Sequence, residues 1–414
     1  MKICLINNLY QPFNRGGAER VTETIAAGLL KAGQEVFIIT TKPYFSELRV
    51  VWLRQIWQSQ TSCELRVYYL NSLYYNLHKF PKFLRLVWHL WNMFNFVSYF
   101  KIKKILRAEK CEAVITNNLM GLGFLTPLAI RSLKIKHLHI AHDIQLIHPS
   151  GLLYYGRENI INGYFARNYA GLMNWLIDSP EIVIFPSRWL LDAHLDKIFF
   201  IKSKRLILPN PVKAVTAAGR KETGGNFNPV KYASRPNHRL GFNGVKFLFI
   251  GQIEEHKGVF LLVEAFKKIK ARFGRANLII AGSGELAGRL KSVAADENIN
   301  FLARVSEEKV DDLIAKADCL VYPSLVYENC PNVIQRALAV GRLVIASDLG
   351  GISELLSKNA GLLFKPADEK ALADKMAWVI NNKNNLSAII DAGKAKAELF
   401  KVDNYIKELL RLMV

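Results

Sequence analysis

The segment Val321–Val333 holds the residues whose types and spacing best fit a chemical role. Its sequence, VYPSLVYENCPNV, reads as a buried strand, a short loop that carries Glu328, and a helix that begins near Pro331, an early helical position that suits proline. A carboxylate accepts hydrogen bonds from sugar hydroxyls, and the free N–H groups of a helix N-terminus attract phosphate. The pattern favours a sugar diphosphate as ligand; the competing interpretation is that Glu328 only caps the helix.

Three further turns between a strand and a helix could contact the same kind of ligand. In FIGQIEEHKGV, Gly251 ends a strand and Lys257 could place a positive charge on a diphosphate, unless it is an ordinary surface lysine. The turn Gly282–Gly284 and the pair Gly350-Gly351 would let the backbone come close to a ligand. The Walker A spacing is absent, and none of these turns is specific when taken alone.

The loop NRGGAER, residues 14–20, follows the first predicted strand. Its paired glycines, Gly16 and Gly17, could bring the backbone close to an anion at the start of the next helix. The alternative is a simple tight turn. The loop lacks the GxGxxG fingerprint of dinucleotide-binding folds, which argues against a dehydrogenase.

Short apolar runs that alternate with amphipathic stretches must position these turns. This alternation predicts an α/β fold with parallel sheets, and 414 residues are enough for two domains. In the first half, Val21–Lys31 is predicted as a crossover helix, and strands are predicted at Lys2–Asn7, Glu35–Thr40, Ala113–Thr116, Lys136–Ala141 and Ile182–Pro186.

Domain boundaries are predicted from a break in this rhythm. Residues 213–244 are rich in Gly, Pro, Asn and Lys and read as a linker plus a surface loop between an N-terminal domain, 1–212, and a C-terminal domain, 245–394. The remaining residues, 395–414, read as one last helix that could pack back on the N-terminal domain. Two doubly wound domains bind ligands at the carboxyl ends of their strands, here in the cleft between the domains.

Charge and cysteine usage narrow the class of protein. The net charge is +21, and residues 1–212 supply +13 of it, with 26 Lys and Arg against 13 Asp and Glu. Such a surface attracts anions, and since no recognised nucleic-acid motif is present, nucleic acid is not expected as a partner. The five cysteines are widely spaced and form no CxxC, which favours a reducing, cytoplasmic setting over a disulfide framework or a zinc cluster.

The basic aromatic segment 78–104 reads HKFPKFLRLVWHLWNMFNFVSYFKIKK. Phe83–Phe100 contains Arg85, His89, Asn92 and Asn95, so a membrane-spanning helix is not predicted. Aromatic side chains between flanking lysines are typical of helices that lie on a membrane surface, so the segment predicts attachment to an anionic membrane. The competing interpretation is an ordinary buried helix of the first domain.

Several motifs together, in this order and spacing, resemble the family 4 glycosyltransferases over nearly the whole chain. They are GGAER (16–20), AHD (141–143), FPS (185–187), LPNPV (208–212), GQIEEHKG (251–258), AGSGE (281–285), YPSLVYENCPNV (322–333) and SDLGGISELL (347–356). The resemblance implies the GT-B fold, in which two Rossmann-like doubly wound domains face each other across a cleft. It also implies a retaining transfer from a nucleotide sugar bound in the C-terminal domain, without a cofactor or a required metal.

The resemblance assigns roles to individual residues. His142 would lie by the transferred sugar, unless it is a packed histidine at a strand end, Lys257 would hold the leaving diphosphate, and Glu328 would bind hydroxyls of the donor sugar. No protein nucleophile is implied. Donor-binding positions would be Gly16, Gly17, Gly251, Gln252, Gly282, Gly284, Asn329, Cys330, Pro331, Asn332, Val333 and Arg336.

Two of these positions depart from the family pattern. An arginine usually follows the glycine that corresponds to Gly251, whereas this chain has Gln252. The family's second acid, eight positions after Glu328, is here Arg336, which cannot accept hydrogen bonds from ribose hydroxyls. One hypothesis is that Arg336 compensates for Gln252 by pairing with a donor phosphate.

Two functions follow. The first is an active transferase that adds sugar to a lipid-linked or polysaccharide acceptor in cell-surface glycan synthesis. The second, which the two departures suggest, is a degenerate GT-B protein that binds nucleotide, glycan or a partner without efficient transfer.

Overall fold

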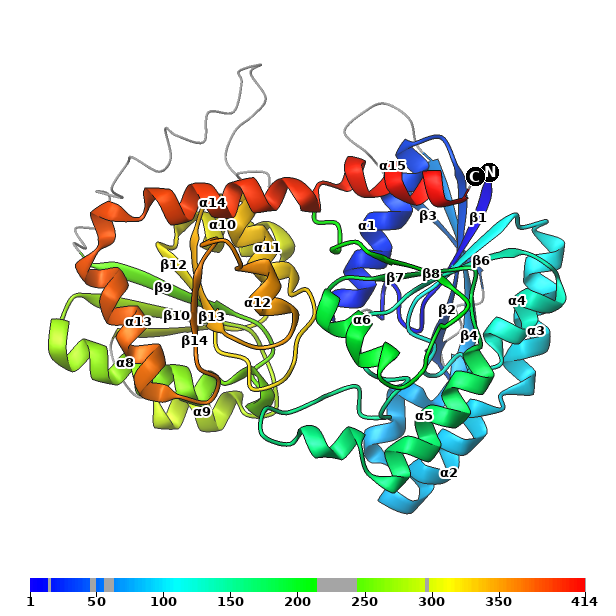
Figure 1. Ribbon diagram of the computed structural model, residues 1–414, viewed down its shortest axis with the longest axis horizontal. Helices are drawn as coiled ribbons and strands as arrows, with labels where there is room; N and C mark the ends of the chain where they lie inside the picture. Colours follow the sequence, from blue (N-terminus) through cyan, green and yellow to red (C-terminus); the bar gives the residue numbers. More distant parts are fainter. Residues whose placement is uncertain (14–15, 45–49, 56–62, 214–243, 295–297, 414) are drawn as a thin grey trace. The chain divides into compact units, whose positions relative to one another are not determined.

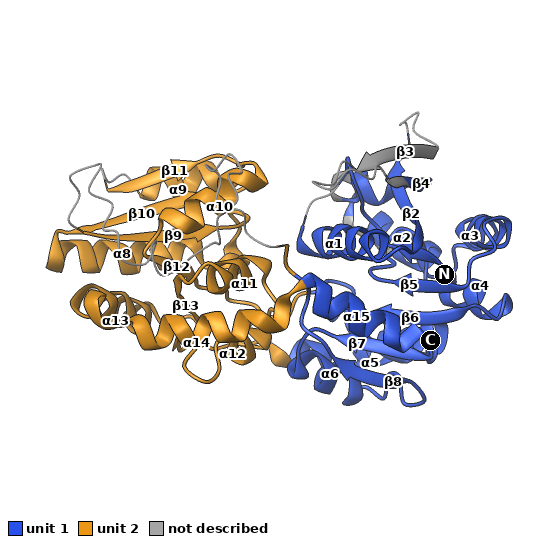
Figure 2. Ribbon diagram, turned by 90° about the horizontal axis from the view of Figure 1, so that it is seen from above, with its two compact units in different colours: residues 1–151, 159–211, 402–414 blue, residues 152–158, 212–401 orange. Residues whose placement is uncertain are grey.

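The chain folds into two compact units in the computed structural model, which describes residues 1–13, 16–44, 50–55, 63–213, 244–294 and 298–413 (Figure 2). Unit 1 consists of Met1–Gly151, Asn159–Pro211 and Val402–Val414, and unit 2 consists of Leu152–Glu158 and Val212–Lys401. The predicted 213–244 linker lies almost entirely outside the described residues. The short segment Leu152–Glu158, which the sequence places in the middle of the N-terminal domain, groups with unit 2.

Unit 1 is an α/β unit with helices on both faces of one sheet (Figure 1). Its strands are β1 (Lys2–Ile6), β2 (Glu35–Pro43), β3 (Val50–Gln55), β4 (Cys63–Ser72), β5 (Ala113–Thr116), β6 (Lys136–Ile140), β7 (Ile182–Phe185) and β8 (Lys204–Ile207). Its helices are α1 (Gly17–Lys31), η1 (Leu73–Lys79), α2 (Lys82–Met93), α3 (Phe96–Ala108), α4 (Thr126–Ser132), η2 (Glu158–Ile161), α5 (Tyr164–Ile177), α6 (Arg188–Leu195) and α15 (Val402–Met413).

The order of strands in the unit 1 sheet is β3-β4-β2-β1-β5-β6-β7-β8. All neighbours are parallel except β3 and β4, which pair antiparallel. The order reverses direction at β1, whose neighbours are β2 and β5, and such a switch point leaves a crevice at the carboxyl ends of the strands. The five predicted strands of the first half are confirmed; β3, β4 and β8 were not predicted.

Unit 2 repeats the architecture with a smaller sheet of order β11-β10-β9-β12-β13-β14. Its strands are β9 (Val245–Ile250), β10 (Ala276–Ala281), β11 (Ile299–Leu302), β12 (Cys319–Tyr322), β13 (Leu343–Ser347) and β14 (Leu362–Phe364), all parallel. Its helices are η4 (Glu255–Lys257), α8 (Val259–Phe273), α9 (Ala287–Val293), α10 (Glu307–Lys316), α11 (Asn332–Ala339), α12 (Gly351–Leu355), α13 (Glu369–Asn381), η5 (Lys383–Asn385), α14 (Ser387–Ala397) and η6 (Glu398–Phe400). Here the switch point is β9, between β10 and β12.

The C-terminal end of the chain corrects one prediction. Residues 395–414 do not form a single helix, because α14 ends at Ala397 and α15 begins at Val402. α14 belongs to unit 2, whereas α15 packs in unit 1, where its Tyr405, Ile406 and Leu409 join the buried core of β1 and α1. Gly28 of α1 permits this packing, since a Cβ there would lie 2.5 Å from Cγ1 of Ile406.

The segment 78–104, for which the sequence predicts membrane-surface or buried helical structure, contains the two helices α2 and α3. It breaks at Phe94 and Asn95, where the Asn95 side chain accepts a hydrogen bond from the Ser98 N–H and caps α3. Two polar residues of this segment face the protein: Asn92 and Asn95 are buried, and Asn92 accepts a hydrogen bond from the Gly121 N–H. Many of the apolar side chains point to solvent instead.

Candidate functional site

The switch point of unit 2 brings together three polar side chains from two separate turns. Lys257 ends η4, Tyr322 ends β12, and Glu328 lies in the loop that follows. The Lys257 Nζ is 2.5 Å from Oε1 of Glu328 and 3.3 Å from Oη of Tyr322, and the Tyr322 hydroxyl donates to the same Glu328 oxygen at 3.0 Å. Lys257 and Glu328, which the sequence predicts as separate contacts to one ligand, thus contact each other directly, and a tyrosine that the sequence argument did not single out completes the cluster.

Burial and mutual charge set the ionisation of this cluster. The side chains of Lys257 and Glu328 are only 16% and 20% exposed. Burial disfavours both charges, yet the neighbouring carboxylate raises the pKa of Lys257 and the neighbouring ammonium lowers the pKa of Glu328. Burial and the Glu328 charge raise the pKa of Tyr322. The cluster therefore holds a fixed cation and a fixed anion at neutral pH.

Glycines allow the turns around this cluster to pack backbone against backbone. Gly258, with φ of +67°, follows Lys257, and a Cβ there would lie 1.9 Å from the carbonyl oxygen of Pro323. At Gly282 a Cβ would lie 1.8 Å from the carbonyl oxygen of Gly251. No side chain can occupy either position without moving a turn, so both glycines are required by close approach. The structure thus joins the predicted glycine turns into one surface.

The Glu328 loop is tied to the backbone on both of its sides. The Gly351 N–H at the start of α12 donates to the Glu328 carbonyl at 2.8 Å. The Leu152–Glu158 segment pairs with the other side, where Tyr155 N–H donates to the Leu325 carbonyl and Tyr327 N–H donates to the Leu153 carbonyl. Glu328 is therefore positioned by groups distant in the sequence. The α11 helix then begins at Asn332, with Pro331 at its N-cap rather than inside it.

Arg336 does not contact the Lys257–Glu328 pair. Its guanidinium, only 13% exposed, donates through Nε to Oδ1 of Asp311 at 2.9 Å and through Nη1 to Oε2 of Glu307 at 2.8 Å. The Nη2 group also donates to Asp311 and to the Glu307 carbonyl. All three guanidinium nitrogens are therefore engaged by α10, which leaves the hypothesis of a phosphate contact without structural support. Gln252 is exposed.

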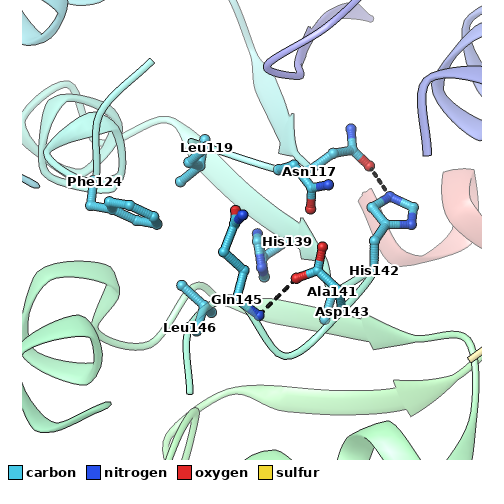
Figure 3. Close-up of a pocket in the computed structure, with 10 residues that line it drawn as sticks. Asn117, Leu119, Phe124, His139, Ala141, His142, Asp143, Gln145 and Leu146 are labelled. Atoms are coloured by element: carbon cyan, nitrogen blue, oxygen red, sulfur yellow. Dashed lines mark hydrogen bonds between the residues drawn. The ribbon is translucent and has the colours of Figure 1, made fainter. Parts of the chain in front are cut away.

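Unit 1 has its own polar pocket at the carboxyl ends of β5 and β6 (Figure 3). Nε2 of His142 is 2.8 Å from Oδ1 of Asn117, and since an amide oxygen only accepts, Nε2 carries the proton. The Asp143 carboxylate accepts the Gln145 N–H at 2.7 Å. Among the described residues, Nδ2 of buried Asn117 has no hydrogen-bond partner. The pocket thus offers an unused donor beside a carboxylate.

Burial shifts the pKa values of both titratable groups of this pocket toward their uncharged forms. It lowers the pKa of His142 to about 4 and raises the pKa of Asp143 to about 6. Two further histidines, His137 and His139, contact the Thr116 hydroxyl at 2.8 and 2.9 Å. Burial lowers the pKa of both, that of His137 to about 3. The imidazoles are uncharged near neutral pH, so His142 acts there as a neutral hydrogen-bonding group.

The paired glycines of the first loop are exposed at the start of α1. Gly16 donates its N–H to Oε2 of Glu19 at 2.7 Å, so the helix N-terminus is partly capped by its own side chain. Burial raises the pKa of Glu19. Gly16, Gly17 and His142 belong to unit 1, whereas the other predicted site residues belong to unit 2.

Comparisons with known families agree with this arrangement. The family described as Glycosyltransferase Family 4 matches residues 15–214, and the family described as Glycosyl transferases group 1 matches residues 233–396. The chain belongs to the family 4 glycosyltransferases. An uncharacterized 42.6 kDa protein in the cps region of Klebsiella pneumoniae is 25% identical to this glycosyltransferase, over 86% of this chain and 87% of that protein.

Two further proteins resemble this glycosyltransferase. The putative teichuronic acid biosynthesis glycosyltransferase TuaC of Bacillus subtilis is 32% identical over 55% of this chain and 54% of its own. The crystal structure of Anabaena HepE in complex with UDP superposes with a TM-score of 0.69 at 15% identity, covering 100% of this chain and 99% of that one. The structural match confirms the predicted GT-B fold.

Sequence reasoning missed several residues of the two sites. Tyr322 could have been found, because it ends the strand that leads into the Glu328 loop. Asp143 stands in the AHD motif directly after His142, so its place beside the pocket was also within reach. Asn117, Glu307 and Asp311 carried no such signal, because they come from parts of the chain that only the fold brings near His142 and Arg336.

Proposed function

We propose that this glycosyltransferase transfers a sugar, with retention of its anomeric configuration, from a nucleotide-diphosphate sugar to a lipid-linked or polysaccharide acceptor. The observation that carries the proposal is the cluster of Lys257, Tyr322 and Glu328 beside the turn that precedes α11. A fixed cation and a fixed hydrogen-bond acceptor side by side match the two halves of a sugar diphosphate. The complex of HepE with UDP is consistent with such a donor.

The chemistry follows from the charges of the cluster. As the bond from sugar to phosphate breaks, negative charge grows on the diphosphate, and a preorganised cation stabilises it by a few kcal/mol, about 3 or 4 for a single strong donor. Lys257 would supply that cation, and Glu328 would accept hydrogen bonds from sugar hydroxyls. The donor would exchange the Lys257–Glu328 ion pair for two contacts of its own. No cofactor and no metal ion is part of this proposal.

The acceptor would be held by unit 1. Its pocket combines the unused Asn117 donor with the Asp143 carboxylate and the neutral His142, a set of groups suited to hydroxyls rather than to a strong anion. The names of the relatives in the cps region and in teichuronic acid biosynthesis are in keeping with synthesis of a cell-surface glycan.

Attachment to the cytoplasmic face of a membrane is part of the proposal. In the described part of the chain, no helix combines the length and apolarity that a membrane crossing needs. The helices α2 and α3 instead expose large apolar side chains, among them Val87, Trp91 and Phe100, which are 60%, 50% and 64% exposed. An apolar surface of this kind next to basic residues suits an anionic membrane.

A degenerate protein that binds a donor without efficient transfer is the second candidate. Gln252 provides no positive charge, and Arg336 is turned toward Asp311 and Glu307. The nucleotide end of the site therefore has fewer groups able to bind a donor than the sugar-phosphate end.

A donor panel decides between the two candidates. UDP-, GDP- and ADP-sugars would be added singly to the purified protein, with and without EDTA, and the melting temperature, donor consumption and product configuration measured. We expect one nucleotide class to raise the melting temperature and to be consumed even in EDTA, with the product anomer unchanged from the donor. Glu328→Gln should abolish consumption, whereas Glu255→Gln, at an exposed carboxylate in the adjacent turn, should not.

Three results would count against parts of the proposal. Stabilisation by a donor without consumption supports the degenerate protein. Loss of activity in EDTA contradicts the metal-independent transfer, and inversion of the anomeric centre contradicts retention.

A further inference from the structure

The two helices α2 and α3 expose many large apolar side chains to solvent. In α2 the exposed residues recur at helical spacing on one face, and they are Phe83, Leu84, Val87, Leu90 and Trp91. The opposite face carries buried Trp88, which stacks on Tyr74, and buried Asn92. The α2 helix is therefore amphipathic, but its apolar face points to solvent. Exposing such a face to water is unfavourable unless something else covers it.

The exposed face of α3 changes character along the helix. Its first turns expose Phe96, Val97 and Phe100, which are 60%, 57% and 64% exposed, whereas Ile102 and Leu106 on the other face are fully buried. The later turns continue the exposed face with Lys104 and Arg107. At 1.5 Å per residue, apolar and basic ends of this face are separated by roughly 10 Å, which is about the depth of a membrane interface.

A hollow lies where the two kinds of residue meet. It is lined by Phe100, Lys103, Lys104, Arg107 and Ala108. The ammonium group of Lys103 lies 5.6 Å from the ring centre of Tyr99 and forms no salt bridge with a carboxylate of the described residues. Within the described residues, neither Lys104 nor Arg107 forms a salt bridge. One aromatic wall and three cations make a place for a phosphate group attached to an apolar chain.

Charge along the two helices points to the same ligand. Residues 82–108 contain six basic residues and no acidic residue, the six being Lys82, Arg85, Lys101, Lys103, Lys104 and Arg107. A second copy of the chain would bring the same charges against each other, so self-association through this face is disfavoured. An anionic surface is complementary both to the charge and to the apolar side chains.

We propose that the hollow formed by Phe100, Lys103, Lys104 and Arg107 binds the phosphates of anionic lipid headgroups while the exposed aromatic residues of α2 and α3 enter the membrane interface. The proposal rests on the membrane attachment proposed above and adds a defined headgroup site to it. Each basic side chain near an anionic membrane contributes about 1 kcal/mol, so three of them should change vesicle affinity by about 100-fold.

Vesicle flotation of the full chain tests the site. Wild type is compared with the variant Lys103→Gln/Lys104→Gln/Arg107→Gln on vesicles of phosphatidylcholine alone and of phosphatidylcholine with phosphatidylglycerol. A matched variant, Lys202→Gln/Lys204→Gln/Arg205→Gln, removes the same charges at exposed positions elsewhere in unit 1. A third variant, Trp91→Ser/Phe96→Ser/Phe100→Ser, reduces the apolar contact. Melting temperatures confirm that each variant folds.

We expect wild type to bind anionic vesicles far more tightly than neutral ones, and the α3 basic variant to lose about 100-fold on anionic vesicles only. The matched variant should bind as wild type, and the aromatic variant should lose binding to both vesicles. Free glycerol phosphate should not release the protein, since a soluble phosphate lacks the apolar chain.

The contrary results are distinguishable. If the basic variant binds anionic vesicles like wild type, or the matched variant loses as much, the headgroup site is wrong although attachment stands. If wild type binds neither vesicle at low salt, attachment itself fails. A dimer in solution that the aromatic variant dissociates would show that a second copy covers the face, which overturns the proposal, as would release by glycerol phosphate.

Discussion

Asp143 in unit 1 and Glu328 in unit 2 both follow the carboxyl ends of parallel strands. Their pKa values are shifted in opposite directions. Burial raises the pKa of Asp143 to about 6, and the hydrogen bonds from the Gln145 N–H and the Asn118 amide, which act in the opposite direction, offset only part of this increase. Burial acts on Glu328 as well, but Lys257 at 2.5 Å and the Tyr322 hydroxyl lower its pKa. One cation accounts for the difference in sign.

This difference separates two kinds of binding site built on the same architecture. Unit 2 keeps a full positive and a full negative charge, which the proposed sugar-diphosphate donor would separate. Unit 1 keeps its imidazoles neutral and its carboxylate weakly acidic, which suits hydroxyl groups that exchange hydrogen bonds. The contrast extends to the histidines, which are concentrated in unit 1.

Acidification should produce the largest difference between the two units. We expect it to unfold unit 1 before unit 2. Burial lowers the pKa of His137 to about 3 and of His142 and His194 to about 4, and that of His139 lies well below its usual value. The unfolded chain binds the extra protons at about pH 6.5, so each histidine removes about 2 kcal/mol of unfolding free energy as the pH falls to about 5. The four together should remove several kcal/mol.

Unit 2 provides the internal reference. His256 is the one histidine among the described residues of unit 2, and burial lowers its pKa to about 4, so histidine protonation should cost unit 2 about 2 kcal/mol over the same range. Hydrogen exchange followed by mass spectrometry, read per peptide from neutral pH downward, measures both units at once. His142→Gln should remove part of the acid sensitivity of unit 1. Earlier exposure of unit 2 peptides would contradict the assignment.

Only some of the residues behind this difference could be predicted from the sequence. The Lys257–Glu328 pair was predictable because each residue stands at a strand-to-helix turn, and the carboxyl ends of parallel strands meet at one edge of a sheet. The burial of Asn92 and Asn95 in the 78–104 segment was not predictable. Their side chains accept hydrogen bonds from the backbone N–H groups of Gly121 and Ser98, respectively. A polar stripe on a helix does not reveal whether water or a buried N–H group satisfies it.

The antiparallel strand β3 and the helix break at Glu398–Lys401 were not predicted, for a related reason. A strand at the edge of a sheet has weak periodicity because fewer of its side chains are packed, and a helix break without proline or glycine leaves little local signal. Arg336 carried a clear signal, its departure from the family pattern, but its partners Asp311 and Glu307 lie on another helix and could not be foreseen.

Removing the cation of unit 2 should make Glu328 behave like Asp143. Lys257→Met leaves a buried carboxylate with only Tyr322 as partner, and should cost about 3 kcal/mol of unfolding free energy near neutral pH. A lowered pKa stabilises the fold above the unfolded value of about 4.3 and loses that contribution as the pH falls through the folded pKa, so the cost should fade in acid. Urea denaturation at several pH values measures it.

A double-mutant cycle isolates this pair. Glu328→Gln added to Lys257→Met should recover much of the loss, because no unpaired charge then remains buried. Lys267→Met, which breaks the more exposed Lys267–Glu264 pair of α8, is the matched control and should cost no more than about 1 kcal/mol. If both lysine substitutions lower the unfolding free energy equally, the Lys257–Glu328 pair is no stronger than an exposed ion pair, and the prediction is wrong.

The smallest expected effect tests the other carboxylate and has the opposite sign. Asp143→Asn should raise the unfolding free energy by about 1 kcal/mol above about pH 7, because it replaces a carboxylate whose folded pKa exceeds its unfolded pKa of about 3.9. The advantage should shrink as the pH falls through about 6, where folded Asp143 takes up its proton. Asp192→Asn, at a carboxylate that is 52% exposed, should change little at either pH. If Asp143→Asn is instead destabilising at neutral pH, the hydrogen bonds from the Gln145 N–H and the Asn118 amide stabilise the ionised carboxylate by more than its burial costs, and the predicted sign is wrong.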